Sequence, residues 1–126
     1  MTTATINVNQ TVAGYIAAWN ETDAGRRRDI IARTWAEDGS YLDSHRDGNG
    51  HAAIDSMIAA AQAQFPGYRV RLSSGIEAHH DRVRFSWSAG GTDEAPLFIA
   101  GTDFAVLAAD GRLRSVTGFV DAMPSV

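Results

Sequence analysis

The sequence predicts an α+β domain in which the helices come first and the strands follow. Up to Gly67 the apolar residues recur at helical spacing, and after it they alternate with polar residues, as in strands that bury one face. The 126 residues suffice for one domain with a real core, so we take residues 1–126 as a single domain. We expect three helices packed on a curved, mostly antiparallel sheet.

The first and third helices are predicted by apolar residues on one stripe. The first helix carries Val8, Val12, Tyr15, Ile16 and Trp19, and it ends in the polar loop 20–23. The third helix follows Gly50, carries Ile54, Met57, Ile58, Ala61 and Phe65, and ends at Pro66-Gly67.

The second helix is predicted from about Ala24 to the pair Asp38-Gly39, where glycine can close a helix at little steric cost. Its inward residues are expected to be Ile30, Ile31, Thr34 and Trp35, and its outward ones Arg26, Arg27 and Arg28. Ser40 to Asp43 then alternates polar and apolar residues, which indicates a strand that ends on a carboxylate beside a turn-rich segment.

The second half of the chain predicts a series of strands joined by turns. Residues 68–72 and 83–87 alternate apolar and polar side chains, and His80-Asp81 is expected to join them as a hairpin. A strand over 97–107 is expected to return through Asp110-Gly111 into 113–121, because this dipeptide is a strong hairpin signal.

The strand 97–107 is apolar on both faces, which a sheet covered by helices on one side does not require. Ile99, Ala105 and Leu107 share a face with Asp103, and Phe98, Phe104 and Val106 share the other. We expect a second copy of the chain to cover that second face, giving a homodimer through the sheet.

Composition narrows the class of partner. With 15 acidic and 11 basic residues the net charge is -4, which disfavours nucleic acid and anionic membranes as partners. The absence of cysteine excludes disulfides and thiolate chemistry. Neither a leader at Met1–Thr5 nor a long apolar run is evident, so we expect a cytoplasmic protein. All the bases are Arg, which we take as a sign of a GC-rich bacterial genome.

Asp103 is the most informative candidate for chemistry, because it interrupts an otherwise apolar strand. A buried ionised carboxylate is costly unless it is paired, so Asp103 is either a neutral hydrogen-bond donor in a dry pocket or the partner of a neighbouring Arg84 or Arg114. Tyr15 is a buried phenol that needs a hydroxyl partner, and Asp43 either faces a pocket or caps a turn.

Several short motifs together resemble the nuclear transport factor 2-like superfamily, and within it the SnoaL-like polyketide cyclases and the ketosteroid isomerases. The motifs are Ala13-Gly14-Tyr15-Ile16 with Trp19, Ala36-Glu37-Asp38-Gly39-Ser40-Tyr41-Leu42-Asp43, Gly50 with Ile54, Gly101-Thr102-Asp103-Phe104, and Asp110-Gly111-Arg112-Leu113. The resemblance spans nearly the whole chain and implies a cone-shaped, cystatin-like fold, commonly dimeric, with a pocket between helices and concave sheet.

The resemblance also implies an activity, namely cofactor-free proton transfer next to a carbonyl of a hydrophobic small molecule. In the isomerase pattern Asp43 is the base and Tyr15 and Asp103 stabilise the oxyanion; in the cyclase pattern Asp103 is the acid/base residue. Departures are Ser44 in place of a usual proline and Ile58 in place of a second tyrosine. His45, Arg46 and Asp47 make the expected pocket lip polar, which favours a smaller or charged ligand over a steroid.

The remaining candidates are weaker and an alternative function stays open. The expected ligand-binding wall consists of Trp19, Trp35, Met57, Phe85, Trp87 and Ile99. His79 and His80 lie in a predicted turn, and His45 with Asp43 or His51 makes a thin set of metal ligands, so we predict neither a metal site nor a cofactor. The alternative is a non-catalytic small-molecule-binding or dimerisation module on the same fold.

Overall fold

The computed structural model describes residues 7–91 and 98–122, and it confirms the predicted α+β class. The elements are α1 (Val8–Asn20), α2 (Ala24–Thr34), β1 (Trp35–Leu42), β2 (Asp47–Asn49), α3 (His51–Gln64), β3 (Arg69–Leu72), β4 (Glu77–His79), β5 (Arg82–Gly90), β6 (Phe98–Leu107) and β7 (Leu113–Ala122). Two sequence predictions fall on residues that are not described. They concern the N-terminal segment Met1–Thr5 and Leu97, the predicted first residue of the strand 97–107.

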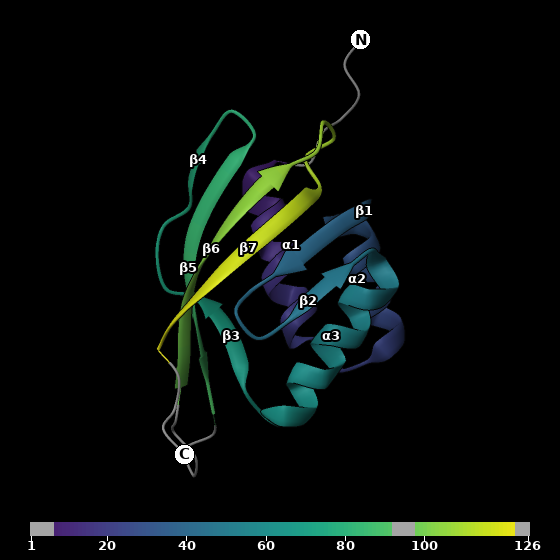
Figure 1. Cartoon of the computed structure of the whole chain (residues 1–126), viewed down its shortest axis with the longest axis vertical. Helices are drawn as coiled ribbons and strands as arrows, with labels where there is room; N and C mark the ends of the chain where they lie inside the picture. The colour runs from purple at the N-terminus through teal and green to yellow at the C-terminus, as the bar shows by residue number, and fades with distance from the viewer. Residues whose placement is uncertain (1–6, 92–97, 123–126) are drawn as a thin grey trace.

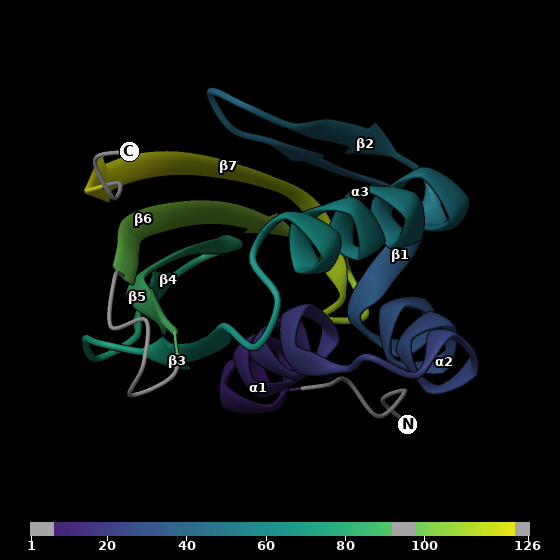
Figure 2. The same cartoon turned by 90° about the horizontal axis from the view of Figure 1, so that it is seen from below.

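One curved sheet holds the strands in the order β2-β1-β7-β6-β5-β3, with β4 pairing to β5 (Figure 1). Its strand pairs are antiparallel except β1 with β7, which run parallel. Figure 2 shows β5, β6 and β7 as a curved wall with α1 and α3 on its concave side. The concave face of the sheet is thus turned toward these helices.

The core lies between α1, α3 and the concave face of the sheet. Its centre is Tyr15, whose ring lies 5.4 Å from the ring of Trp35 and 5.4 Å from that of Phe85. Helix α1 is anchored at its start by Asn7, whose side chain accepts the backbone N–H of Gln10 in a capping box. A fixed helix start and aromatic packing together hold Tyr15 in one place.

The predicted end of the second helix is wrong. Helix α2 ends at Thr34, and Trp35 already pairs with Leu113 as the first residue of β1. Gly39 does not close a helix but allows close packing within the sheet, since a Cβ there would lie 2.9 Å from the Ala36 carbonyl oxygen and 3.0 Å from that of Leu113.

The prediction that Arg27 points outward is also wrong. Its guanidinium is buried, and it donates to the Asp55 carboxylate at 2.6 Å and to the Glu21 carbonyl at 3.1 Å. A further bond at 3.1 Å reaches the Gln62 amide oxygen. Arg27 thus joins α2 to α3 and to the end of α1, while Arg26 and Arg28 are exposed.

The hairpins follow the sequence in part. The turn at His80-Asp81 exists, with His80 at a φ of 52°, but it joins β4 to β5 rather than joining β3 to β5. Strand β3 nevertheless pairs antiparallel with β5 further along. Asp110-Gly111 lies in the predicted turn between β6 and β7, and the short strand β2 is an element that the sequence pattern does not indicate.

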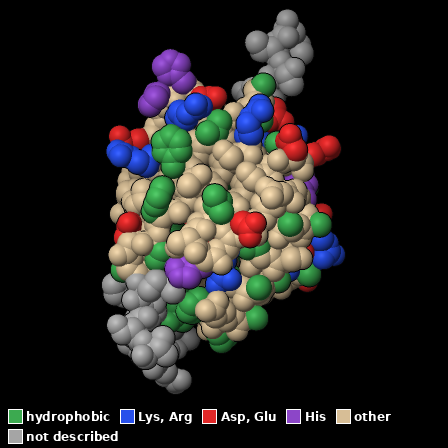
Figure 3. Space-filling model, in the orientation of Figure 1, with side chains coloured by type: hydrophobic (Ala, Val, Ile, Leu, Met, Phe, Trp, Pro, Cys, Tyr) green, Lys and Arg blue, Asp and Glu red, His purple; other side chains and the backbone are tan. Residues whose placement is uncertain are grey.

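The convex face of the sheet carries large apolar side chains in contact with solvent. Phe104 on β6 is 43% exposed and Phe119 on β7 is 63% exposed; the side chain of Phe98 lies outside the described part. Figure 3 shows separate hydrophobic side chains over the strands on the visible face, with charged side chains between them. The homodimer stays a prediction. Within residues 7–91 and 98–122, no helix is long and apolar enough to cross a membrane.

Candidate active site

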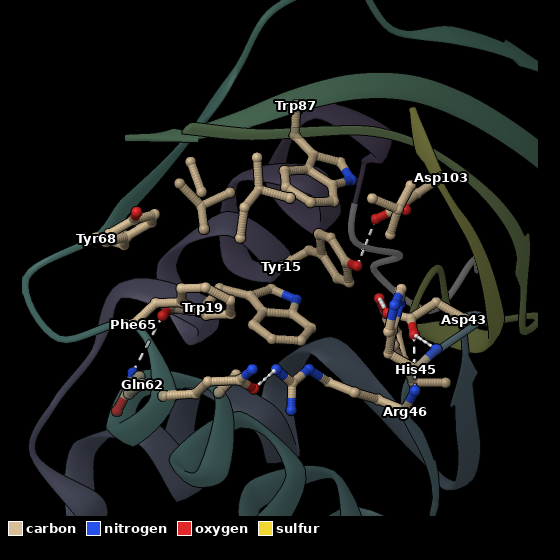
Figure 4. A pocket seen from close by; sticks show the side chains of 17 residues that line it. Tyr15, Trp19, Asp43, His45, Arg46, Gln62, Phe65, Tyr68, Trp87 and Asp103 are labelled. Atoms are coloured by element: carbon tan, nitrogen blue, oxygen red, sulfur yellow. Dashed lines mark hydrogen bonds between the residues drawn. The ribbon is translucent and has the colours of Figure 1, made fainter. Parts of the chain in front are cut away.

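A pocket of about 330 Å³ opens between the concave sheet and helices α1 and α3 (Figure 4). Apolar and aromatic side chains make up most of its wall, with a few polar groups at the floor and the lip. Its lining residues are Tyr15, Trp19, Tyr41, Asp43, His45, Arg46, Ala61, Gln62, Gln64, Phe65, Tyr68, Val70, Trp87, Ala89, Ile99, Asp103 and Val120. This combination is typical of a small-molecule site.

The floor of the pocket is formed by Tyr15 and Asp103. The Tyr15 hydroxyl on α1 donates to Asp103 Oδ2 on β6 at 2.5 Å, and both residues are buried. Asp103 Oδ1 has no hydrogen-bond partner among the described residues. No arginine pairs with Asp103 there, so the alternative of a salt bridge to Arg84 or Arg114 is wrong.

The surroundings of Asp103 change its acidity. Burial raises the pKa of its carboxyl from the ordinary value of 3.8 to about 6, although the Tyr15 hydroxyl and the Trp87 indole oppose this rise. The nearby Asp43 carboxylate adds to the rise. A carboxyl group with a pKa of about 6 can both accept and return a proton near neutral pH.

A second pair of tyrosine and aspartate lies beside the first. The Tyr41 hydroxyl donates to Asp43 Oδ2 at 2.6 Å, while Asp43 Oδ1 accepts the backbone N–H groups of His45 at 2.7 Å and Arg46 at 2.8 Å. Asp43 therefore faces the pocket and caps a turn at once. Burial, together with the neighbouring carboxylates, raises the pKa of both Tyr15 and Tyr41, so both phenols stay protonated as donors.

Two glycines on neighbouring strands give the floor its shape. Gly118 pairs with Asp103 across β7 and β6, and a Cβ at this position would lie 2.8 Å from Asp103 Oδ1 and 3.2 Å from the Tyr41 hydroxyl oxygen. Gly101 pairs with Trp87, and a Cβ there would lie 2.6 Å from the Trp87 ring. A side chain at either position would crowd the pocket.

Two indole groups bring further donors to the wall. The Nε1 atoms of Trp19 and Trp87 are buried and make no close hydrogen bond among the described residues, although the Trp87 indole lowers the pKa of Asp103 and the Trp19 indole that of Tyr15. Figure 4 shows the Trp87 nitrogen on the side of Asp103. A buried donor without a partner is unfavourable, so a ligand oxygen in this pocket would gain hydrogen bonds here.

The structure brings Tyr15, Asp43 and Asp103 to one pocket, as the resemblance implies. Of the six residues predicted as ligand-binding wall, Trp19, Trp87 and Ile99 line it, and Trp35, Met57 and Phe85 do not. These last three are buried in the core. Alternation along a strand predicts which side chains face inward, but not whether they reach the cavity or the layer beneath it.

Other residues of the site were not predicted from the sequence. Tyr41 is two residues before Asp43 on an alternating strand, so a shared face was the signal that could have identified it. Gln62 lines the pocket and donates to the carbonyl oxygens of Trp19 and Glu21, and Gly118 shapes the floor. Neither of these two residues has a local sequence signal.

The histidines do not build a metal centre in the described parts of the chain. No group of three or more His, Asp or Glu side chains is placed there to hold a metal ion. His79 and His80 are exposed on the β4–β5 turn with their Nδ1 atoms 3.1 Å apart. His51 contacts the Trp35 carbonyl, and His45 contacts the Ser44 hydroxyl.

Comparison with known proteins identifies the family. The model of the SnoaL-like domain matches residues 12–116. A candidate isomerase of the SnoaL-like family from Agrobacterium tumefaciens is 37% identical, with a TM-score of 0.85 over 91% of this chain and 97% of that one. A candidate SnoaL-like polyketide cyclase from Jannaschia shares the fold at 16% identity, with a TM-score of 0.69 over 96% of this chain and 92% of that one.

A protein of the NTF2-like fold from Exiguobacterium has a TM-score of 0.72 at 18% identity, covering 90% of this chain and 99% of that one. None of the proteins with curated descriptions matches the sequence. The fold, the pocket and the extent of the family match agree, and the chain belongs to the SnoaL-like family.

Proposed function

We propose that this protein is a small enzyme of the isomerase or cyclase type, which transfers a proton next to a carbonyl of a hydrophobic small molecule without a cofactor. One observation carries the proposal: the Tyr15 hydroxyl holds one oxygen of Asp103, a buried residue that lines the pocket, and its other oxygen has no close hydrogen-bond partner among the described residues. A polar group of this kind in a mostly apolar cavity is a candidate for general acid/base catalysis.

The hydrogen bonds favour Asp103 over Asp43 as the base. Three donors occupy the Asp43 carboxylate, two on one oxygen and one on the other. Asp103 has one oxygen without a close partner in the described parts of the chain, and its pKa of about 6 is close to neutral pH. We therefore assign Asp103 the acid/base role of the cyclase pattern, and Asp43 the role of orienting Tyr41.

The proposed step conserves atoms and charge. Asp103 Oδ1 takes a proton from the carbon beside the substrate carbonyl, the C–H electron pair forms a C=C bond, and the carbonyl oxygen becomes an enolate. The indole N–H groups of Trp19 and Trp87, which make no close hydrogen bond among the described residues, would donate to this oxygen. The protonated Asp103 then returns its proton to another carbon. In a cyclisation the enolate carbon instead attacks a second carbonyl, and the oxygen of that carbonyl takes the proton from Asp103.

Hydrogen exchange at a bicyclic conjugated enone in deuterated water tests the proposal. We expect wild type to exchange the hydrogens beside the carbonyl, and Asp103→Asn to lower the rate about a hundredfold or more, because an amide cannot accept the proton. Tyr15→Phe should lower the rate about tenfold, because it removes the hydrogen bond that holds Asp103. Asp43→Asn should have the smallest effect of the three.

Two outcomes would contradict parts of this assignment. Equal exchange rates in wild type and Asp103→Asn, with the enone still bound, would favour the non-catalytic binding module. If Asp43→Asn abolished hydrogen exchange while Asp103→Asn retained it, the base would be Asp43 instead of Asp103. Circular dichroism of each variant separates these outcomes from loss of the fold.

A further inference from the structure

We propose that Arg46 selects substrates that carry a carboxylate, so that the pocket takes a carbonyl compound with an apolar middle and an anionic far end. This inference rests on the proposed function, since it places the reacting carbonyl at Asp103. It adds the chemical class of the substrate and the residue that distinguishes it.

The backbone of Arg46 is fixed at the lip of the pocket. Its N–H donates to Asp43 Oδ1 at 2.8 Å, and its carbonyl accepts the Asp43 N–H at 2.9 Å. Both polar groups of the Arg46 backbone are thus bonded to one residue of the turn between β1 and β2. The side chain therefore leaves the turn from a defined point.

The guanidinium extends from this turn toward the end of α3. One of its nitrogens donates to Gln64 Oε1 at 2.6 Å, and Figure 4 shows Arg46 across the pocket from Asp103. A bond to a neutral amide holds the group in place without neutralising its charge. Among the described residues, the other donors of its planar fork have no partner and are open to a ligand.

Arg46 combines two features: it lines the pocket, and its charge has no carboxylate partner among the described residues. The guanidinium groups of Arg26, Arg27, Arg84 and Arg112 are each paired with an Asp or Glu carboxylate. No such carboxylate lies within ion-pair distance of Arg46 in the described parts of the chain. A partly shielded arginine at a pocket lip is suited to a planar anion, because its fork matches the two oxygens of a carboxylate.

The wall between the two polar ends determines the rest of the ligand. Phe65, Val70, Ile99 and Val120 contribute apolar surface to the same cavity. A cavity of about 330 Å³ suits a compound of about two fused rings. The predicted ligand is therefore an apolar ring system with a ketone or enol at one end and a carboxylate at the other.

A matched pair of probes tests the charge preference at equilibrium. The first is a hydroxynaphthoate with its hydroxyl and carboxylate at opposite ends, in which the hydroxyl stands in for the enol. The second is its primary amide, which has nearly the same shape and no charge. Calorimetry of both probes with wild type, Arg46→Gln, Arg46→Lys and Arg114→Gln gives the preference for the carboxylate in each protein.

We expect wild type to bind the carboxylate about tenfold more tightly than the amide, and Arg46→Gln to bind both about equally. Arg46→Lys should keep part of the preference, since it keeps the charge but loses the fork. Arg114→Gln removes the same charge from an exposed position on β7 that does not line the pocket, and it should behave as wild type.

The inference is overturned if wild type shows no preference, if neither probe binds, or if Arg46→Gln keeps the preference. Its failure is separable from failure of the proposed function, because binding requires no proton transfer. A preference for the carboxylate without enone exchange would support the ligand class and refute the catalysis. Enone exchange without a preference for the carboxylate would support the catalysis and refute the ligand class.

Discussion

Replacing Asp103 by Asn should stabilise the protein at neutral pH while it removes the proposed activity. The carboxyl is buried with 0% of its surface exposed, and its pKa rises from 3.8 to about 6 on folding. Between these values the native state binds a proton that the unfolded state has released. The free energy of unfolding of wild type therefore falls as pH rises through this window.

The size of the effect follows from the shift. A difference of about two pKa units at 1.36 kcal/mol per unit corresponds to about 3 kcal/mol of lost stability above pH 7. An amide at this position carries no ionisable proton and can still accept the Tyr15 hydrogen bond. Asp103→Asn should therefore match wild type near pH 4 and exceed it by about 3 kcal/mol near pH 8.

Urea denaturation at a series of pH values, followed by tryptophan fluorescence, measures this difference. Subtracting the two curves cancels the titration of groups that do not interact with Asp103, provided that both proteins unfold in one step with equal slopes. A difference that stays constant between pH 4 and 8 would refute the buried, raised pKa. A wild type more stable than the variant at pH 8 would refute the unpaired state of the carboxylate.

Three further predictions concern the floor, the helix layer and the convex face of the sheet. Gly118→Ala should weaken binding of the enone about tenfold or more with the fold retained, because the new methyl group would lie 2.8 Å from Asp103 Oδ1. The control is Gly75→Ala, whose methyl group would meet no described atom within 4 Å. Arg27→Ala should lower the free energy of unfolding by about 3 kcal/mol or more, because it leaves the shielded Asp55 carboxylate unpaired. Arg26→Ala breaks an exposed ion pair with Glu21 and should lower it by less than about 1 kcal/mol. Light scattering should give twice the chain mass for wild type at micromolar concentration, and Phe119→Lys should yield the monomer.

Each of these predictions has an outcome that contradicts it. Equal affinities of Gly118→Ala and Gly75→Ala for the enone would show that the floor of the pocket can accommodate an added methyl group. Equal losses of stability at the two arginines would mean that the buried ion pair contributes no more than the exposed one. A wild type that runs as a monomer would remove the proposed contact between sheets.

The sequence predicted the order of elements well because periodicity reports which face of each element is buried. It failed at the end of α2, where Trp35 enters the sheet although Asp38-Gly39 offers a helix stop. Pairing of Trp35 with Leu113 determines the boundary, and that partner lies far along the chain. Arg27 was misassigned for a related reason, since its burial depends on Asp55 in another helix.

For the site, the sequence identified residues but not their depth. Tyr15, Asp43 and Asp103 were selected by the resemblance, and the fold brings them to one cavity. Phe85 and Trp87 stand two apart on one strand, yet only Trp87 reaches the cavity. The difference depends on the curvature of the sheet and on the position of α1, which local alternation does not encode.

The glycines at 101 and 118 have a consequence for how this scaffold could change its ligand. The free volume beside Trp87 and Asp103 exists because two strand positions carry a hydrogen atom in place of a methyl group. Alanine at one of these positions would narrow the pocket and favour slimmer ligands, with no change to the sequence of the helices or their caps. Laboratory evolution toward new substrates should begin at Gly118, because a Cβ at Gly101 would also lie 2.7 Å from the backbone carbonyl oxygen of Phe119.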